Sequence, residues 1–357
     1  MQRQKKYLVI ASFLAILSIL VISYQKGAFC KSMDSKKIST IFAIKDTSVV
    51  TKIFIADMFG EKVLLAKTKE GWMVDYSKQA SPLKIKDLLV TIAAIRVAQP
   101  IAKPAQRSII EMLAVSSTKV EIYETKPLFK LFGYHCFNKE RLAKTYYLGD
   151  ATQNNLGSFA SIEGMPDPYI VYKPGFRGYI TPQFSPKSID WYSKRIFSTK
   201  LTHIQKASFL DIKNTENSFC VEKTGTRTFA LFDFQNNVVS DYDTTRIINM
   251  LSEFREKYYE MYLPNISNSL KDSILSLYCF KVVSVTDINN QTTTMKVYYL
   301  FNTGSLYEDD ELIDNSYAEI NKDRCYATFN EDTSEIYTVQ LFQFERQFQP
   351  FSYFFKK

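Results

Sequence analysis

The same order of structural elements occurs twice in this sequence, which limits the possible folds more than any other feature. In each half, three segments of alternating apolar and polar residues precede one amphipathic helix, which we expect to begin at Ser81 and at Asp243. A shift of 162 positions superposes the two helical patterns. Internal duplication explains this agreement better than chance similarity between two sheet-rich halves. The aligned pairs are Ile85 and Ile247, Leu88 and Met250, Leu89 and Leu251, and Ile92 and Phe254.

A second pair of matching segments follows the helices. Residues Lys144–Leu148 and Lys296–Leu300 both read K-x-Y-Y-L, at a shift of 152 positions. In the first half a short helix is expected near Gln106–Leu113, before these strands. Runs of strands are thus separated from the helices, which favours antiparallel sheets. The sequence predicts an α+β protein of two duplicated lobes, each a mostly antiparallel sheet packed with one long and one short helix.

The segment Tyr7–Tyr24 contains no charged residue, glycine or proline. Eighteen helical residues extend about 27 Å, close to the thickness of a bilayer core. The sequence therefore predicts an N-terminal transmembrane helix that anchors the chain. Two alternatives stay open: a cleaved signal peptide, and a lipoprotein modified at Cys30, although the bulky Phe29 precedes that cysteine.

The basic residues are concentrated around this hydrophobic segment. The whole chain has a formal net charge of +8, but residues 1–37 contain seven Lys and Arg against one acid. This distribution is typical of membrane flanks, and it argues against nucleic-acid binding, which needs a contiguous basic face. A short basic head usually stays in the cytoplasm, so we expect a single-pass protein of the inner membrane with most of the chain in the periplasm.

These patterns divide the chain into four parts. Residues 1–24 form a cytoplasmic head and the anchor, and residues 25–45 form a linker. The first α+β lobe covers residues 46–197, and the second covers residues 198–357.

The stretch Gly175–Tyr179 is the strongest candidate for a binding surface. Two glycines around an arginine allow unusual backbone angles and close approach of another chain. The alternative is a structural corner in which the glycines turn the chain and the aromatic rings pack inside. The candidate residues are Phe176, Arg177, Tyr179 and Trp191, whose types are favoured at binding hot spots.

Catalytic motifs are missing from the sequence. It contains two histidines and no phosphate-binding loop, nucleophile elbow or zinc-protease motif. His135 and Cys136 are neighbours, and adjacent residues of an extended chain point in opposite directions, so they are not expected to act as a catalytic pair. The acidic run Glu308–Glu311 lacks the spacing of a calcium loop. We expect no enzyme activity, no metal and no cofactor, and free cysteines in preference to a disulfide.

Several segments resemble an uncharacterised family of membrane-anchored proteins from Bacteroidetes-type bacteria, of the domain-of-unknown-function 4340 type. The resemblance lies in Phe42–Asp57, Gly71-Trp72, Gly149 and Pro174–Phe197, and it covers most of the chain from Phe42. The most specific piece is PGFxGYxT followed by DW; Tyr192 departs from the arginine expected there. Related domains occur in accessory proteins beside ABC transporters implicated in gliding motility. The resemblance implies an extracytoplasmic accessory role and no reaction.

Together these observations predict a membrane-anchored accessory or scaffold protein of an envelope assembly, with a protein partner in the cell envelope. An alternative is a module that binds a glycan or small molecule between the two lobes. A hydrolase with an unrecognised site is the least favoured class.

Overall fold

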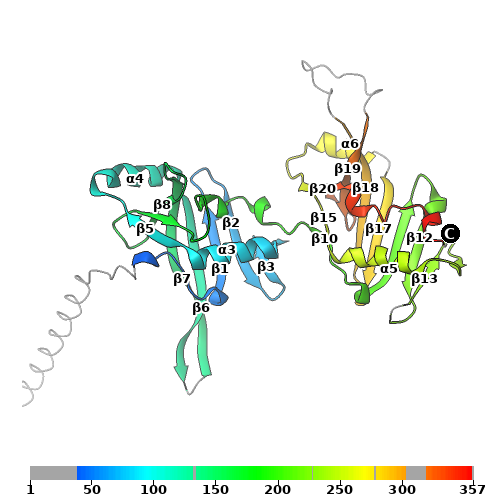
Figure 1. Ribbon diagram of the computed structural model, residues 1–357, viewed down its shortest axis with the longest axis horizontal. Helices are drawn as coiled ribbons and strands as arrows, with labels where there is room; N and C mark the ends of the chain where they lie inside the picture. The colour runs from blue at the N-terminus through cyan, green and yellow to red at the C-terminus, as the bar shows by residue number, and fades with distance from the viewer. Residues whose placement is uncertain (1–37, 132–133, 227, 277–278, 303–318, 356–357) are drawn as a thin grey trace, which may run out of the picture. The chain divides into compact units, whose positions relative to one another are not determined.

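A computed structural model describes residues 38–131, 134–226, 228–276, 279–302 and 319–355 (Figure 1). The chain divides into two compact units between Tyr192 and Ser193, close to the boundary expected after Phe197. The predicted anchor Tyr7–Tyr24 lies outside the described residues. Among the residues that are described, no helix is long and apolar enough to cross a membrane.

The described residues of the first unit form one nine-stranded sheet in which every neighbouring pair is antiparallel. The strand order is β4-β3-β2-β1-β6-β7-β8-β9-β5. The β6–β7 hairpin extends beyond its neighbours, because β6 pairs with β1 only as far as Glu124. The strands are β1 (Val50–Ala56), β2 (Lys62–Thr68), β3 (Gly71–Val74), β4 (Lys78–Gln79), β5 (Arg96–Pro100), β6 (Thr118–Leu131), β7 (Tyr134–Ala151), β8 (Ser158–Ile162) and β9 (Tyr169–Tyr172).

Two helices of the first unit cover opposite faces of this sheet. Helix α3 (Pro82–Ala94) buries Ile85, Leu88 and Ile92 in the main core, as the 3.6-residue pattern predicts. Helix α4 (Lys103–Ser116) packs on the other face, against β7 and β8. The prediction of one long and one short helix is wrong, because α4 has 14 residues and α3 has 13. Most residues of α4 are exposed, so the spacing of apolar residues gives little indication of where this helix begins and ends.

The described part of the second unit repeats this topology. Its nine-stranded sheet has the order β14-β13-β12-β11-β17-β18-β19-β20-β16, the same as in the first unit. Helix α5 (Thr244–Ser252) follows the first four strands. Helix α6 (Asn268–Ser276) precedes the last four and is the second helix that the sequence predicts for this lobe without locating it. A two-stranded ribbon joins β10 (Arg195–Phe197) to β15 (Lys257–Tyr258). The sheet strands are β11 (Ile204–Asp211), β12 (Phe219–Lys223), β13 (Phe229–Phe232), β14 (Val238–Val239), β16 (Met261–Tyr262), β17 (Cys279–Asp287), β18 (Thr292–Phe301), β19 (Ile320–Phe329) and β20 (Asp332–Gln340).

Matching hydrogen bonds confirm the predicted alignment of the two main helices. The backbone N–H of Ile44 donates to the carbonyl of Ile92, and the N–H of Thr199 donates to the carbonyl of Phe254. Ile92 and Phe254 are one of the pairs related by the 162-residue shift. Ile85 and Ile247, a second pair, are both buried in the core of their own unit.

The K-x-Y-Y-L match is out of register in the structure. Its tyrosines lie on the corresponding strands β7 and β18, but Tyr146 packs in the core beneath α3 whereas Tyr298 packs with Ile274 of α6 on the opposite face. In the second core, Met295 takes the position of Tyr146. Side chains alternate between the faces of a strand, so a slip by an odd number of residues exchanges the two faces.

Two further predictions need correction. The linker does not extend to residue 45, because Phe42, Ala43 and Ile44 are buried in the first core. The apolar, aromatic run Phe342–Phe355 favours a final strand over the second core by its sequence, but it forms the 3-10 turns η8 (Leu341–Phe344) and η9 (Phe351–Phe354). Pro350 separates the two turns, and the run places Phe344 and Phe354 in the core without strand pairing.

Candidate functional site

Each unit ends in a tail of two 3-10 turns that packs on its first helix. In the first unit these turns are η2 (Thr181–Gln183) and η3 (Ser188–Trp191). The N–H of Ser81 donates to the carbonyl of Trp191 at 2.7 Å, and the N–H of Asp243 donates to that of Phe354 at the same distance. Trp191 therefore corresponds to Phe354, and both side chains are buried.

The tails differ in how they leave the sheet. In the second unit β20 ends at Gln340 and η8 begins at Leu341, with no residue between them. In the first unit β9 ends at Tyr172 and η2 begins only at Thr181. We call residues 173–180 the inserted loop. The second unit forms a corresponding tail without this loop, so the shared fold does not require the loop.

The predicted binding stretch lies in this inserted loop. Gly175 and Gly178 have φ angles of 78° and 139°, which side-chain-bearing residues rarely adopt. A Cβ atom at Gly178 would also lie 3.2 Å from the ring of Phe176. Ile180 fixes the end of the loop, because its side chain is buried and its N–H donates to Ser158 Oγ at 3.0 Å. The two glycines therefore permit the backbone angles of the loop, and Ile180 fixes where it ends.

The structure separates the four candidate residues into two groups. Phe176 and Tyr179 are 41% and 38% exposed, and Arg177 is exposed and makes no hydrogen bond or ion pair with the described residues. Trp191 is 4% exposed, and its Nε1 donates to the Ser185 carbonyl at 2.9 Å. Trp191 is thus a core residue, as the structural-corner alternative expects, whereas the other three form an exposed surface.

A pocket of about 400 Å³ lies beside the inserted loop. Lys84, Asp87 and Leu88 of α3 form one wall, and Phe176 brings the loop into contact with it. The sequence alone does not mark Lys84 and Asp87 as pocket residues, because a charge on an exposed helix face resembles any solvated charge. The remaining lining residues are Lys173, Pro182, Gln183, Ser185, Asp190 and Trp191.

The corresponding position in the second unit is filled. Lys84 donates to the Asp190 carbonyl, and the equivalent Arg246 donates to the Tyr353 carbonyl. However, six residues separate the two buried tail aromatics in the first unit, at positions 185–190, and nine separate them in the second, at 345–353. The longer tail places Gln347 over α5, where it is 2% exposed and donates to the carbonyl of Met250. The shorter tail leaves the pocket open.

The pocket contains charges of both signs. Lys173 Nζ donates to the buried Thr91 Oγ1 at 3.0 Å and lies 5.8 Å from the centre of the Phe176 ring. Among the described residues, neither Lys84 nor Lys173 forms an ion pair with a carboxylate. The side chain of Asp190 accepts a hydrogen bond from Ser185. Two ammonium groups without paired anions, next to aromatic carbon, suit a small polar ligand or an anionic group of a partner.

The other reactive side chains do not gather into a site in the described structure. His203 is exposed at the end of the turn η4 (Leu201–His203); His135 and Cys136 lie on β7, where their side chains are not described. Burial raises the pKa of the free thiols of Cys220, Cys279 and Cys325, so they stay protonated at neutral pH. No group of three His, Cys, Asp or Glu in the described residues could hold a metal, and the acidic run Glu308–Glu311 lies outside them.

Comparison of the chain with protein-family models, curated proteins and solved structures finds no match. The resemblance to the domain-of-unknown-function 4340 type therefore depends on the sequence segments alone. The structure itself shows how two units of one topology differ: the first unit has the inserted loop and an open pocket beside α3.

Proposed function

We propose that this protein is a non-catalytic accessory or scaffold component of a cell-envelope assembly, and that its first unit binds a protein partner through the inserted loop. One observation carries this proposal. The second unit has the same strand order and a corresponding tail of two 3-10 turns without residues 173–180, so the loop is an addition that the fold does not need.

The exposed side chains of the loop suit a protein contact. Tyrosine and arginine are enriched at hot spots, and Arg177 has its full hydrogen-bonding capacity free among the described residues. Ile180 is buried and donates its N–H to Ser158 Oγ, which fixes one end of the loop and lowers the entropy that binding costs. Phe176 adds apolar area beside Arg177, and together they resemble the centre of a small interface.

The membrane location belongs to the same proposal. It is supported by the uncharged segment Tyr7–Tyr24 behind a short basic head, which favours a single-pass anchor in the inner membrane with both units in the periplasm. The family resemblance adds an association with ABC-type transporters. The shared topology and matching helix contacts support an origin of the two units by internal duplication.

The open pocket supports a second candidate function, the binding of a small polar molecule. From the sequence, such a ligand is expected between the two lobes. The observation that now favours this function lies within the first unit, where the shorter tail leaves about 400 Å³ beside α3. A loop and a pocket that share Phe176 could also serve one partner whose anionic side chain enters the pocket.

Site-specific photocrosslinking in intact cells tests the main proposal. A photoreactive phenylalanine analogue replaces Tyr179 in the full chain, and a matched control places it at Phe59, which is 82% exposed on another loop of the same unit. We expect one discrete crosslinked protein from position 179 and none from position 59. Arg177→Ala should weaken the crosslink at least about tenfold, since a hot-spot arginine contributes about 2 kcal/mol.

The control for charge is Arg107→Ala, which removes another exposed arginine, on α4, and should leave the crosslink unchanged. Equal crosslinking from positions 59 and 179, or an unchanged crosslink in a folded Arg177→Ala protein, would contradict the proposal.

A further inference from the structure

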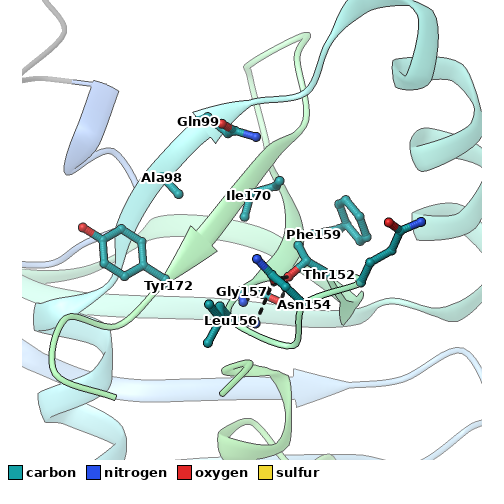
Figure 2. Close-up of a pocket in the computed structure, with 10 residues that line it drawn as sticks. Ala98, Gln99, Thr152, Asn154, Leu156, Gly157, Phe159, Ile170 and Tyr172 are labelled. Carbon is teal, nitrogen blue, oxygen red and sulfur yellow. Dashed lines mark hydrogen bonds between the residues drawn. The ribbon is translucent and has the colours of Figure 1, made fainter. Parts of the chain in front are cut away.

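A second pocket of the first unit lies on the opposite side of its sheet from α3. Its volume is about 600 Å³, and Figure 2 shows it between β5, the end of β9 and the loop that joins β7 to β8. Ile170 and Tyr172 of β9 reach it because they alternate with the core residues Tyr169 and Val171. This pocket shares no residue with the inserted loop or with the pocket beside α3.

The lining of the second pocket contains no charged side chain. Three amides, Gln99, Gln153 and Asn154, provide its polar groups together with the Tyr172 hydroxyl. Gln99, Gln153 and Tyr172 make no side-chain hydrogen bond with the described residues. An amide offers donors and acceptors side by side, so this lining matches a ligand whose groups are both donor and acceptor.

The loop at residues 152–157 is held in a fixed shape. Thr152 is buried, and its hydroxyl donates to Asn154 Oδ1 at 2.7 Å, which also accepts the N–H of Leu156 at 3.1 Å (Figure 2). Gly157 allows the loop to approach β9, because a Cβ there would lie 2.8 Å from Ile170 Cγ2. Asn154 Oδ1 accepts both hydrogen bonds, so the NH₂ group of this side chain remains available to a ligand. The polar wall is therefore pre-formed.

We propose that this pocket binds a neutral saccharide. A sugar ring has a rim of hydroxyl groups, which are donors and acceptors, and faces of C–H groups. The amides match the rim, and the aromatic and aliphatic side chains of Phe159, Leu156 and Tyr172 can cover a face. The absence of charge from the lining disfavours phosphorylated or carboxylated ligands, which would lose hydration without a cationic partner. The inference is independent of the proposed protein contact.

Calorimetric titration of the full chain in zwitterionic lipid nanodiscs tests the inference, because nanodiscs avoid sugar-based detergents. The probes are cellobiose, maltose and N,N′-diacetylchitobiose, with a uronic-acid disaccharide as the charged comparison. We expect saturable binding of at least one neutral probe and none of the charged one. Asn154→Asp keeps the oxygen that the loop needs and removes the NH₂ donor, so it should weaken binding about three- to tenfold.

Gln99→Ala should weaken binding to a similar extent, whereas Gln79→Ala, an exposed amide on β4 outside the pocket, should not. Arg177→Ala should also leave saccharide binding intact, which separates this test from that of the proposed partner. Absence of saturable binding by all three neutral probes would overturn the inference. Preference for the charged probe, or equal losses in Gln99→Ala and Gln79→Ala, would do the same.

Discussion

At the scale of single residues, Trp191 supports the fold and not the exposed surface. Its ring is buried in the first core, and its backbone carbonyl accepts a hydrogen bond from the N–H of Ser81 at the start of α3. Trp191→Ala should therefore lower the free energy of unfolding by about 3–5 kcal/mol, since it leaves a large cavity. Tyr179→Ala, which removes a side chain from the inserted loop, should change it by less than about 1 kcal/mol.

Urea denaturation of the two variants measures this difference. A Trp191→Ala protein as stable as the Tyr179→Ala protein would show that the indole is not part of the core. From the sequence, only its residue type marks Trp191 as a candidate, and tryptophan is favoured in binding sites and in cores alike. In the structure Trp191 is buried and Phe176 is exposed. The position of Trp191 depends on the contact between the tail and Ser81, and no local sequence pattern encodes that contact.

At the scale of elements, the two corresponding helices begin in different ways. The Asp243 side chain accepts the N–H groups of Thr245 and Arg246, whereas the Ser81 side chain makes no capping bond. Pro82, which has no N–H group, follows Ser81. Asp243→Ala should therefore destabilise the protein by about 1 kcal/mol, and Ser81→Ala should be nearly neutral.

Thermal or chemical unfolding of these two variants provides a matched comparison. Equal losses in both would mean that the hydroxyl of Ser81 caps α3 in solution. The sequence predicted both helix starts, because capping residues and proline are local signals. It did not predict that only one cap uses its side chain, since that depends on the orientation of the first turn.

The strands show where sequence patterns stop being informative. Helical spacing aligned α3 with α5 correctly, because the apolar face has only one way to meet the core. The K-x-Y-Y-L match failed because a tyrosine suits either face of a strand. Tyr146 packs in the core below α3, and Tyr298 packs with Ile274 of α6, a helix whose position the sequence does not predict. Pairing with distant strands decided the register.

At the scale of the whole molecule, the two units provide an internal comparison. A shared strand order and shared helix–tail hydrogen bonds define what the fold needs. The inserted loop and the open pocket are what the first unit has in addition. The sequence predicted the repeated order of elements and three of the loop's exposed residues. It could not identify the loop as an insertion, since this required knowing where β9 and β20 end.

Replacement of residues 174–179 by two glycines tests this account most directly. Ile180 is kept because it is buried. The account predicts that the melting temperature of the full chain falls by no more than about 4 °C, a change of about 1 kcal/mol, and that the partner identified by crosslinking no longer co-purifies. Phe59→Ala, the exposed-aromatic control, should retain the partner. A protein that unfolds without the loop, or one that stays folded and still retains its partner, would contradict the claim that the loop is a binding surface added to a complete fold.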